Sequence, residues 1–509
     1  MSLLILVIPS LTICTLFYLY YKFITIPSKI QHHFRQQGIR GPNYNPFTGN
    51  SGELQRLLVT ADDKPLSKLE SLNNDQVLRN VLPHYYFWSK VYGEQFLYWF
   101  GNKPRLAVAN PDMIKEILLN TSGSFRKARV NPLVKGLFGE GIVYLEGDQW
   151  AVHRKITSQA FNMERVKELV PEIVASAKSL LDEIEVKITD ENFVELDVYK
   201  EFNNLSADVI SRTAFGSNFE EGKGIFELQD QLVRIASDAI NSVYFPGFKY
   251  MPTKKNRLSW DLQRATKEMI IKIIEKNNKT NENPKALLSL LTTPYKTKGN
   301  VEKRLSLEEI IDECKTFYFA GKESTANLLT WAFILLGWNQ EWQTRAREEV
   351  VRVCGHDELP SVEHLANFKM INMILNEALR LYPAAPISLR ETTNNVKIGG
   401  LQIPAKTQLF IAMAAIHYDP KIWGDDAKLF NPMRFIEPKK HLATYFPFGL
   451  GPRICVGQNL AIVEAKIVLA MIVRKYNFVV SPSYVHAPVQ VLTVCPKYGA
   501  PMILRRVSS

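Results

Sequence analysis

The stretch FGLGPRICVG, residues 448–457, decides how this chain is interpreted. It places Cys455 two residues after Arg453 in a loop studded with glycines, and the apolar helical pattern QNLAIVEAKIVLAMIVRKY follows the loop directly. A cysteine just ahead of a helix lies near free N–H groups and the positive end of the helix dipole, both of which favour an anion. The glycines let the backbone fold closely under the sulfur. The pattern predicts a thiolate that binds a metal.

The surroundings of Cys455 narrow the choice of metal. No second cysteine or histidine lies nearby in the sequence, so zinc and an iron–sulfur cluster fit poorly. A single axial ligand to haem iron fits well, and Arg453 is placed to pair with a haem propionate. The alternative is an inert cysteine buried in a turn.

The composition is that of a globular protein. The 509 residues are 46% hydrophobic and 22% charged, with a formal net charge of +11. No zinc-finger spacing, RNP-like stretch or basic low-complexity arm supports a nucleic-acid partner. An anionic membrane surface, an acidic protein partner and a generally basic solvated surface remain as explanations. The five cysteines form no CxxC pair, so a disulfide framework is not expected.

The N-terminus predicts a membrane anchor. SLLILVIPSLTICTLFYLYY, residues 2–21, carries no charge and has the length of a helix that crosses a bilayer. Lys22, Lys29, Arg35 and Arg40 follow it, so the tip is expected in the lumen and the remainder in the cytosol. A cleaved signal peptide is the alternative, but a basic n-region and a small-x-small cleavage site are missing.

The chain after the anchor is predicted to form a connector and one large domain. Glycines and prolines in QGIRGPNYNPFTGN (37–50) break regular structure, so residues 22–50 are expected to connect the anchor to a catalytic domain over 51–509. Three-to-four apolar spacing predicts a mainly α fold with small β-sheets. The predicted helices cover 162–190, 225–243, 258–277, 306–338, 340–354, 361–382 and 457–476, and strand-like runs cover 105–110 and 395–412.

The cysteine loop resembles a known signature. Its pattern FxxGxRxCxG, with Phe448, Gly451, Arg453, Cys455 and Gly457 in place, is similar to the haem-binding signature of the cytochrome P-450 superfamily. The resemblance implies the cytochrome P-450 fold, a single large haem domain behind an N-terminal transmembrane helix. It also implies haem b as cofactor, with its iron ligated by Cys455 and with Phe448 and Arg453 beside it.

A long helical pattern holds the second motif, FYFAGKESTANLL (317–329). The helix is predicted to open with a capping box from Ser306 to Glu309. Ala320 and Gly321 remove side-chain bulk from one turn, which would let a flat cofactor and a small gas molecule approach the backbone. The alternative is a Gly–Ala patch that packs against another helix.

The same motif carries an acid beside an alcohol. Glu323 adjoins Ser324, and such a pair can deliver the protons that cleavage of the O–O bond consumes. The stretch resembles the oxygen-activating motif of the superfamily, in which an acid precedes a threonine. Here Ser324 occupies the threonine position and Thr325 follows. Serine keeps the hydroxyl but loses the β-branch that restricts its rotamer.

Further arginines match haem-contacting positions of the superfamily. Trp150 and Arg154 lie at i,i+4 in DQWAVHRK (148–155) and resemble the WxxxR element, whose side chains reach a propionate. Arg390 in ISLRET occupies the place of another propionate-binding arginine. An ordinary surface arginine is the alternative for each.

An ion cluster is also implied. Glu377 and Arg380 lie one turn apart in NEALRLYP, an arrangement that is common on wet helix faces. The helix around them is apolar nearly all round, so the pair is expected to be buried and to need further partners. With Arg434 in FNPMRF, the three charges resemble the structural Glu–Arg–Arg cluster of the superfamily.

The resemblance covers essentially the whole chain and implies a function. QGIRGP, FYFAGKEST and PKYGAP (496–501) look like plant microsomal members, in the group that includes secologanin synthase and hormone- and terpenoid-oxidising enzymes. It implies a single-pass protein of the endoplasmic reticulum membrane, with a cytosolic catalytic domain. That domain is expected to act as a monooxygenase, inserting one oxygen atom from O2 into a lipophilic terpenoid, steroid or hormone-like molecule. NADPH–cytochrome P-450 reductase, a flavoprotein, is the expected electron donor.

Other functions and one interface remain open. A haem-thiolate isomerase or dehydratase that acts on hydroperoxides without a reductase is the main alternative, and a non-enzymatic haem sensor or scaffold is the third. A basic patch for the reductase is expected from Lys155, Arg453, Lys439 and Lys440.

Overall fold

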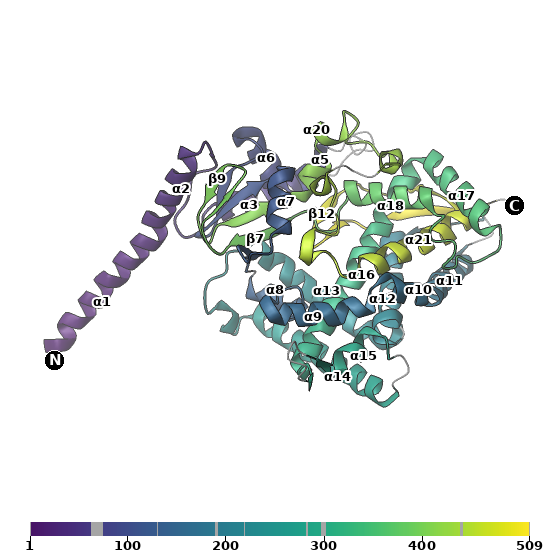
Figure 1. Cartoon of the computed structure of the whole chain (residues 1–509), viewed down its shortest axis with the longest axis horizontal. Helices are drawn as coiled ribbons and strands as arrows, with labels where there is room; N and C mark the ends of the chain where they lie inside the picture. Colours follow the sequence, from purple (N-terminus) through teal and green to yellow (C-terminus); the bar gives the residue numbers. More distant parts are fainter. Residues whose placement is uncertain are drawn as a thin grey trace.

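The computed structural model describes residues 2–62, 75–129, 131–188, 192–217, 219–280, 284–296, 302–437 and 441–507. Most of the described chain is helical, with small sheets, as the sequence predicts (Figure 1). The α-helices are α1 (Ser2–Tyr20), α2 (Ile26–Gln36), α3 (Ser51–Asp62), α5 (Asp75–Val81), α6 (Pro83–Tyr92), α7 (Pro111–Leu119), α8 (Pro132–Phe138), α9 (Gly147–Ala160), α10 (Met163–Glu168), α11 (Val170–Lys187), α12 (Val198–Phe215), α13 (Phe219–Ile240), α14 (Lys254–Thr280), α15 (Leu287–Thr292), α16 (Leu307–Trp338), α17 (Gln340–Cys354), α18 (Lys369–Leu381), α19 (Met413–His417), α20 (Pro420–Trp423) and α21 (Gln458–Lys475).

The largest sheet lies toward the N-terminal helices and has the strand order β1-β2-β10-β7-β3 (Figure 1). Strands β2 and β10 run parallel, whereas the other neighbours are antiparallel. A second sheet, β11-β14-β4, is antiparallel, and the described residues also form three two-stranded antiparallel sheets, β5-β6, β8-β9 and β12-β13. The strands are β1 (Leu97–Phe100), β2 (Lys103–Val108), β3 (Phe125–Lys127), β4 (Phe193–Asp197), β5 (Tyr295–Lys296), β6 (Glu302–Lys303), β7 (Ser388–Thr392), β8 (Val396–Ile398), β9 (Leu401–Ile403), β10 (Gln408–Ile411), β11 (Tyr476–Val480), β12 (Pro488–Gln490), β13 (Val494–Pro496) and β14 (Pro501–Arg506).

Helix α16 runs through the middle of the molecule (Figure 1). Its N-terminus is closed by the predicted capping box, which is confirmed. The Ser306 hydroxyl accepts from the Glu309 amide, and the Glu309 carboxylate accepts from the Ser306 amide at 2.8 Å. Every residue from Thr325 to Gly337 is buried, so the second half of the helix is core on all faces.

The N-terminal helix projects from the body of the protein (Figure 1). A π-helical turn over Tyr21–Thr25 joins α1 to α2, and irregular structure begins only after Gln36. The side chain of Gln37 then bonds the backbone of Gln402 in β9 from both sides, at 3.0 Å and 2.6 Å, which ties α2 to the β8–β9 hairpin. Within the part of the chain that the structure describes, no helix has both the length and the hydropathy required to cross a bilayer.

Most predicted helices are present, with shifted ends. Over 361–382, the helix begins only at Lys369, because the preceding residues fold as turns in which the Ser361 amide bonds the His364 ring at 3.1 Å. Helix α12 is not among the predicted helices. Its buried face carries hydroxyls, such as Ser211 and Thr213, that bond backbone carbonyls one turn earlier at 2.8 and 2.6 Å. These polar residues interrupt the apolar spacing although they lie in the core.

Glu464 makes stability depend on pH. It is buried on α21, where the Ser206 hydroxyl of α12 donates to Oε1 at 2.7 Å, and burial raises its pKa from 4.5 to about 8. Because the folded chain holds this proton more tightly than the unfolded chain, its contribution is fully present below the unfolded pKa and is lost as the pH rises toward about 8. We therefore expect E464Q to melt at a higher temperature than the wild type at about pH 8.5, with the difference shrinking toward about pH 5. Scanning calorimetry measures this, and a pH-independent difference would contradict the assignment.

Candidate active site

The cysteine loop is a tight turn closed ahead of α21. The Cys455 amide donates to the Phe448 carbonyl at 2.8 Å, and a 3-10 turn over Gly451–Arg453 bends the chain between them. Gly457 is the N-cap of α21, so Cys455 lies two residues before the cap. The backbone amides of Gly457 and Gln458 lie close enough to the sulfur to lower the pKa of the thiol. Phe448 packs against the main core.

The thiol of Cys455 is exposed to solvent although protein surrounds it closely. Burial raises the pKa of Cys455, and the two amides and the charge of Arg154 offset only part of this effect. The sequence predicts that the helix N-terminus favours the anion, but desolvation of the thiolate outweighs it.

Gly451 allows the loop its close approach to α7. Its φ is +76°, and a Cβ at this position would lie 2.3 Å from the Leu118 carbonyl oxygen. We expect G451A to lower the free energy of unfolding by about 1–3 kcal/mol and to weaken retention of the cofactor. G457A is the matched control, because its φ is −88° and nothing lies within 4 Å of the added carbon. Denaturant unfolding of both variants measures this, and equal losses would contradict the explanation.

Helix α9 holds the cysteine loop through the two side chains of its WxxxR element. The Arg453 guanidinium lies 4.3 Å from the centre of the Trp150 ring, within range of a cation–π interaction. Arg154 Nη1 donates to the Ile454 carbonyl at 2.7 Å, immediately before the cysteine. The structure therefore brings Trp150 and Arg154 to the loop itself.

A cluster of cations beside the loop fits the carboxylates of a haem. Strand β3 places Lys127 directly opposite Arg390 in β7, and Arg453 lies close enough to lower the pKa of both. Burial and these charges bring the pKa of Lys127 to about 7 and that of Arg390 to about 10. Arg453 Nη1 is buried and lacks a hydrogen-bond partner among the described residues. Like charges opposite one another destabilise a sheet, so an anionic group of the kind haem propionates supply suits the cluster.

Lys127 is a candidate cofactor contact that the sequence did not single out. It lies in the basic run Arg126–Arg129, but the sequence alone does not show which of these side chains faces Arg390. The neighbouring Arg126 turns instead to Glu391, with Nη2 2.5 Å from Oε1. Only the pairing of β3 with β7 shows that Lys127 lies opposite Arg390 while Arg126 lies opposite Glu391.

The small residues of α16 face different neighbours. Ala320 is exposed in a stretch whose preceding residues, from Glu313 to Phe319, are all buried. A Cβ on Gly321 would lie 2.6 Å from the Ile210 side chain, so this glycine permits α16 to pack closely on α12. Ala320 is therefore the small residue on the open side of the helix.

The acid and alcohol of α16 are held differently. The Ser324 hydroxyl donates to the Ala320 carbonyl at 2.7 Å and remains partly accessible, whereas Thr325 is buried. Glu323 accepts from Thr493 Oγ1 at 3.0 Å, and burial raises the pKa of its carboxyl. A carboxyl with a raised pKa holds its proton more tightly than an ordinary carboxyl and can take part in proton transfer.

The structure places Glu377, Arg380 and Arg434 in one buried cluster. The Arg380 guanidinium donates two hydrogen bonds of 2.7 Å to the Glu377 carboxylate, and both side chains are 0% exposed. Arg434 Nε lies 3.4 Å from Glu377 Oε1 and its Nη2 lies 2.6 Å from Asp426. This cluster joins α18 to the segment that precedes the cysteine loop.

A second buried carboxylate fixes α9 to α16. Glu313 Oε1 lies 2.6 Å from His153 Nδ1 and accepts from the Ile142 amide at 2.8 Å. One turn later, Thr316 donates to the Phe138 carbonyl at 2.7 Å. The loop between α8 and α9 is thus fastened to α16, a role that the sequence motifs do not reveal.

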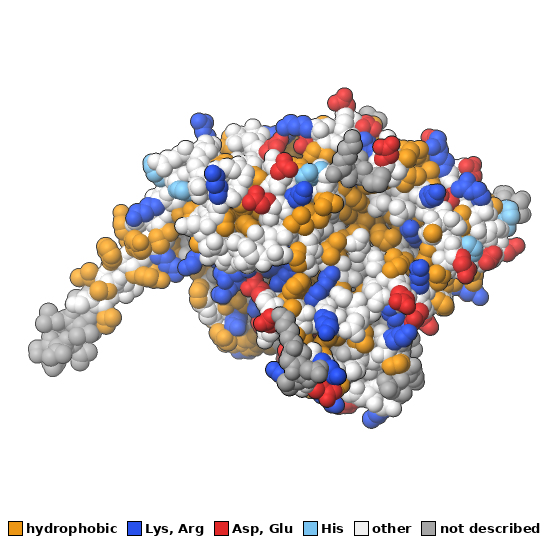
Figure 2. Space-filling model, viewed as in Figure 1, with side chains coloured by type: hydrophobic (Ala, Val, Ile, Leu, Met, Phe, Trp, Pro, Cys, Tyr) orange, Lys and Arg blue, Asp and Glu red, His pale blue; other side chains and the backbone are white. Residues whose placement is uncertain are grey.

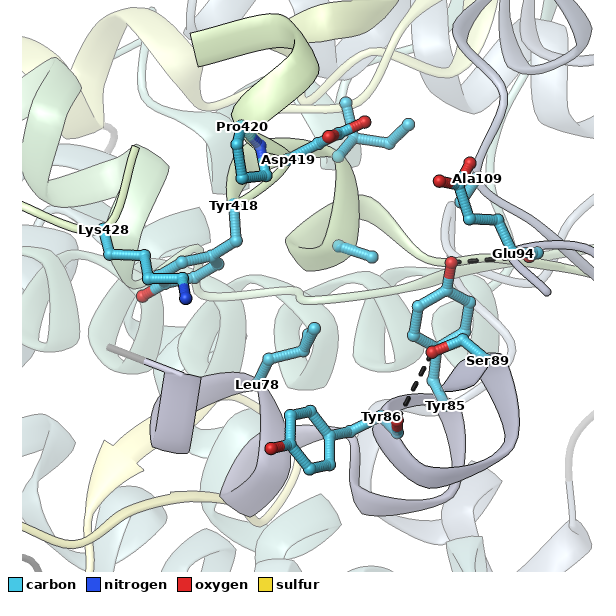
Figure 3. Close-up of a pocket in the computed structure, with 12 residues that line it drawn as sticks. Leu78, Tyr85, Tyr86, Ser89, Glu94, Ala109, Tyr418, Asp419, Pro420 and Lys428 are labelled. Carbon is cyan, nitrogen blue, oxygen red and sulfur yellow. Dashed lines mark hydrogen bonds between the residues drawn. The ribbon is translucent and has the colours of Figure 1, made fainter. Parts of the chain in front are cut away.

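A surface pocket of about 270 Å³ lies away from these residues (Figure 3). It opens between α6 and the α19–α20 segment, where Tyr85 donates to the Glu94 carbonyl and Ser89 to the Tyr86 carbonyl. None of the site residues predicted from the sequence lines this pocket, so it is separate from the candidate active site.

The cysteine loop, with the cations beside it, fits the class of site that holds haem through a cysteine thiolate. The family model for Cytochrome P450 matches residues 77–495. The chain is 41% identical over 497 residues to Cytochrome P450 734A1 of Arabidopsis thaliana, covering 95% of this chain and 93% of the relative. It is 41% identical over 502 residues to Cytochrome P450 734A6 of Oryza sativa subsp. japonica, with 95% and 92% covered, and 40% identical over 491 residues to Cytochrome P450 CYP72A219 of Panax ginseng, with 94% and 93% covered.

The chain belongs to the cytochrome P450 family and is a P450 monooxygenase. Membership implies a haem cofactor with cysteine thiolate ligation, O2, a small-molecule substrate and a redox partner. The resemblance of the sequence to the cytochrome P-450 superfamily is therefore confirmed.

Proposed function

We propose that this P450 monooxygenase oxidises a lipophilic small molecule of terpenoid, steroid or hormone-like character. The observation that carries the proposal is a second apolar cluster beside the open face of α16. Phe319, the neighbour of Ala320, packs edge-on against Phe138 of α8 at 4.8 Å, and Leu492 reaches the same cluster from the β12–β13 turn. An apolar wall next to the oxygen-activating residues favours an apolar substrate. The buried members of the cluster are Val134, Leu137, Leu232, Ile235, Ala236, Ala239, Leu262 and Phe319.

Each site residue has a role in this proposal. Cys455 supplies the thiolate, and Arg453, Arg390, Lys127, Arg154 and Trp150 hold the propionate side of the haem. Haem bound to a thiolate supplies the activation of dioxygen, in which electron donation from sulfur favours O–O cleavage. Glu323 and Ser324 store and deliver protons at their side-chain oxygens. Ala320 keeps the helix surface free of bulk.

Electrons are proposed to come from NADPH through a flavin reductase that docks on the basic side of the cysteine loop. Lys155 of α9 is exposed there, which supports contact with an acidic partner. Arg453 stacks on Trp150 and contributes less to an outer surface. Lys439 and Lys440 lie outside the described residues.

Residues 2–21 are proposed to anchor the chain in the endoplasmic reticulum membrane, with residues 22–50 as connector and 51–509 as the cytosolic domain. Hydrophobic side chains follow the projecting helix, and Leu11, Ile13, Leu16 and Phe17 are 61–70% exposed (Figure 2). Such exposure favours a lipid partner. Deleting residues 2–21 should move the protein from the membrane fraction to the supernatant.

The test of the activity uses microsomes that carry this chain and a reductase. With NADPH and isotopically labelled dioxygen, mass spectrometry should find one labelled oxygen in a lipophilic metabolite. Product that forms from a hydroperoxide alone, without NADPH or reductase, would favour the isomerase or dehydratase instead. If no member of a terpenoid and steroid panel shifts the haem spectrum on binding, the substrate class is wrong.

A further inference from the structure

The Glu323 carboxyl is held by a residue far away in the sequence. Thr493 Oγ1 donates to Glu323 Oε1 at 3.0 Å, and Asn327 Nδ2 lies 3.3 Å from the same oxygen and 3.0 Å from Thr493 Oγ1. The hydrogen bonds from Thr493 and Asn327 to this carboxyl both end at Oε1, and among the described residues none reaches Oε2. One carboxyl oxygen is therefore fixed while the other stays available.

Thr493 is itself held in a rigid position. It ends the turn between β12 and β13, in which the Val491 amide donates to its carbonyl at 3.2 Å. The next residue, Val494, is bonded on both sides. Its amide donates to the Ala384 carbonyl at 3.0 Å, and its carbonyl accepts from Trp331 Nε1 at 2.9 Å. The indole belongs to α16, so this hydrogen bond ties the hairpin to the helix next to Thr493.

We propose that Thr493 is a positioning residue for Glu323, which holds Oε1 in place and leaves Oε2 free to exchange the proton that Ser324 passes on. The inference rests on the proposed function of Glu323 and Ser324 as the proton-delivering pair. It adds the C-terminal hairpin to that machinery, because the hydroxyl of Thr493 decides how the acid is oriented and which of its forms is favoured.

The charges and hydrogen bonds around Glu323 determine whether loss of the Thr493 hydroxyl raises or lowers the pKa of this carboxyl. Burial raises the pKa of Glu323, whereas the charge of Lys322 and the hydrogen bonds from Thr493 and Asn327 lower it. Lys322 is partly engaged by Asp230, with Nζ 2.6 Å from Oδ1. Loss of the Thr493 hydroxyl removes a donor to the carboxylate, so the pKa of Glu323 should rise further. The groups that face this carboxyl are Lys322 of α16, Asp230 of α13, Tyr199 of α12 and Cys495 of β13.

The test is an infrared titration of the purified holoprotein. E323Q identifies the C=O band of the protonated Glu323 carboxyl, and the midpoint of that band is followed against pH. In T493V, which keeps the shape of threonine but lacks its hydroxyl, the midpoint should move to higher pH, and T493S should restore it. The fraction of NADPH electrons recovered in product should fall about tenfold in T493V at neutral pH and recover in T493S.

The matched control is T393V. The Thr393 hydroxyl lies on an exposed turn, where it donates to the Gly123 carbonyl at 2.9 Å and lies 3.0 Å from Asn394 Oδ1, so T393V removes a threonine hydroxyl away from Glu323. A midpoint that does not move in T493V, or that moves equally in T393V or T493S, would overturn the proposal. Failure of the proposed function is separate, because the wild type would then form no labelled product from the terpenoid and steroid panel while the infrared titration still reports on Glu323.

Discussion

In C455S, the red-shifted carbon-monoxide difference band disappears and reductase-driven oxygenation falls to background. Serine matches the size of cysteine, so the loop and its hydrogen bond from residue 455 to the Phe448 carbonyl should remain. A hydroxyl is not a thiolate, and it supplies neither the soft ligand nor the electron donation on which haem-thiolate chemistry depends. The expected effect is therefore a total loss, because no other described cysteine lies in this loop.

The control for this variant is C354S. Cys354 is a buried cysteine at the end of α17, where burial raises the pKa of its thiol just as it does at Cys455. Replacing it should change stability modestly and leave the carbon-monoxide spectrum intact. The difference spectrum of membranes that carry each variant measures the outcome. A C455S protein that keeps the red-shifted band would remove the basis of every statement about oxygen chemistry.

E377A should lower the free energy of unfolding by about 3–5 kcal/mol. The substitution leaves Arg380 fully buried with only the carbonyls of His417, Ala427 and Leu429 as partners, which do not neutralise its charge. It also removes the acceptor for the Asn431 amide at 3.0 Å. The cluster holds the segment leading to the cysteine loop, so haem retention should fall together with stability.

The matched control is E341A, which breaks another one-turn Glu–Arg pair. Arg345 and Glu341 of α17 are 2.5 Å apart but exposed, so the expected loss is below about 1 kcal/mol. Urea unfolding followed by circular dichroism compares the two. The double variant E377L/R380L should lose less of its free energy of unfolding than E377A, because it leaves no unpaired buried charge. A double variant as unstable as the sum of the single changes would show that packing, and not charge burial, explains the loss.

Local spacing is sufficient to predict the cysteine loop and the motif of α16. The residues of FGLGPRICVG lie within one turn and the start of one helix, where the backbone itself fixes their relative positions. The Ser306–Glu309 capping box and the i,i+4 pair Trp150–Arg154 can be predicted from the sequence for the same reason. In each case, helix geometry converts sequence distance into spatial distance.

Other features depend on which surfaces meet. Gly321 is small because Ile210 of α12 lies against it, and nothing in its own helix indicates this. The thiol of Cys455 has a raised pKa because the surrounding protein desolvates it, an effect that outweighs the helix terminus predicted from the sequence. Burial is a property of the packed chain, so spacing does not predict its size.

The sequence by itself determined the helical class of the fold and the family, and it predicts Cys455 as the ligand and Glu323 and Ser324 as the acid–alcohol pair, because these depend on residues close together in the chain. Only the tertiary structure decided that Lys127 faces Arg390 and that Thr493, 170 residues from Glu323, holds its carboxyl. Strand pairing and hairpin docking bring such residues together. These contacts arise from the burial of surfaces far apart in sequence, and no local pattern encodes which surfaces will meet.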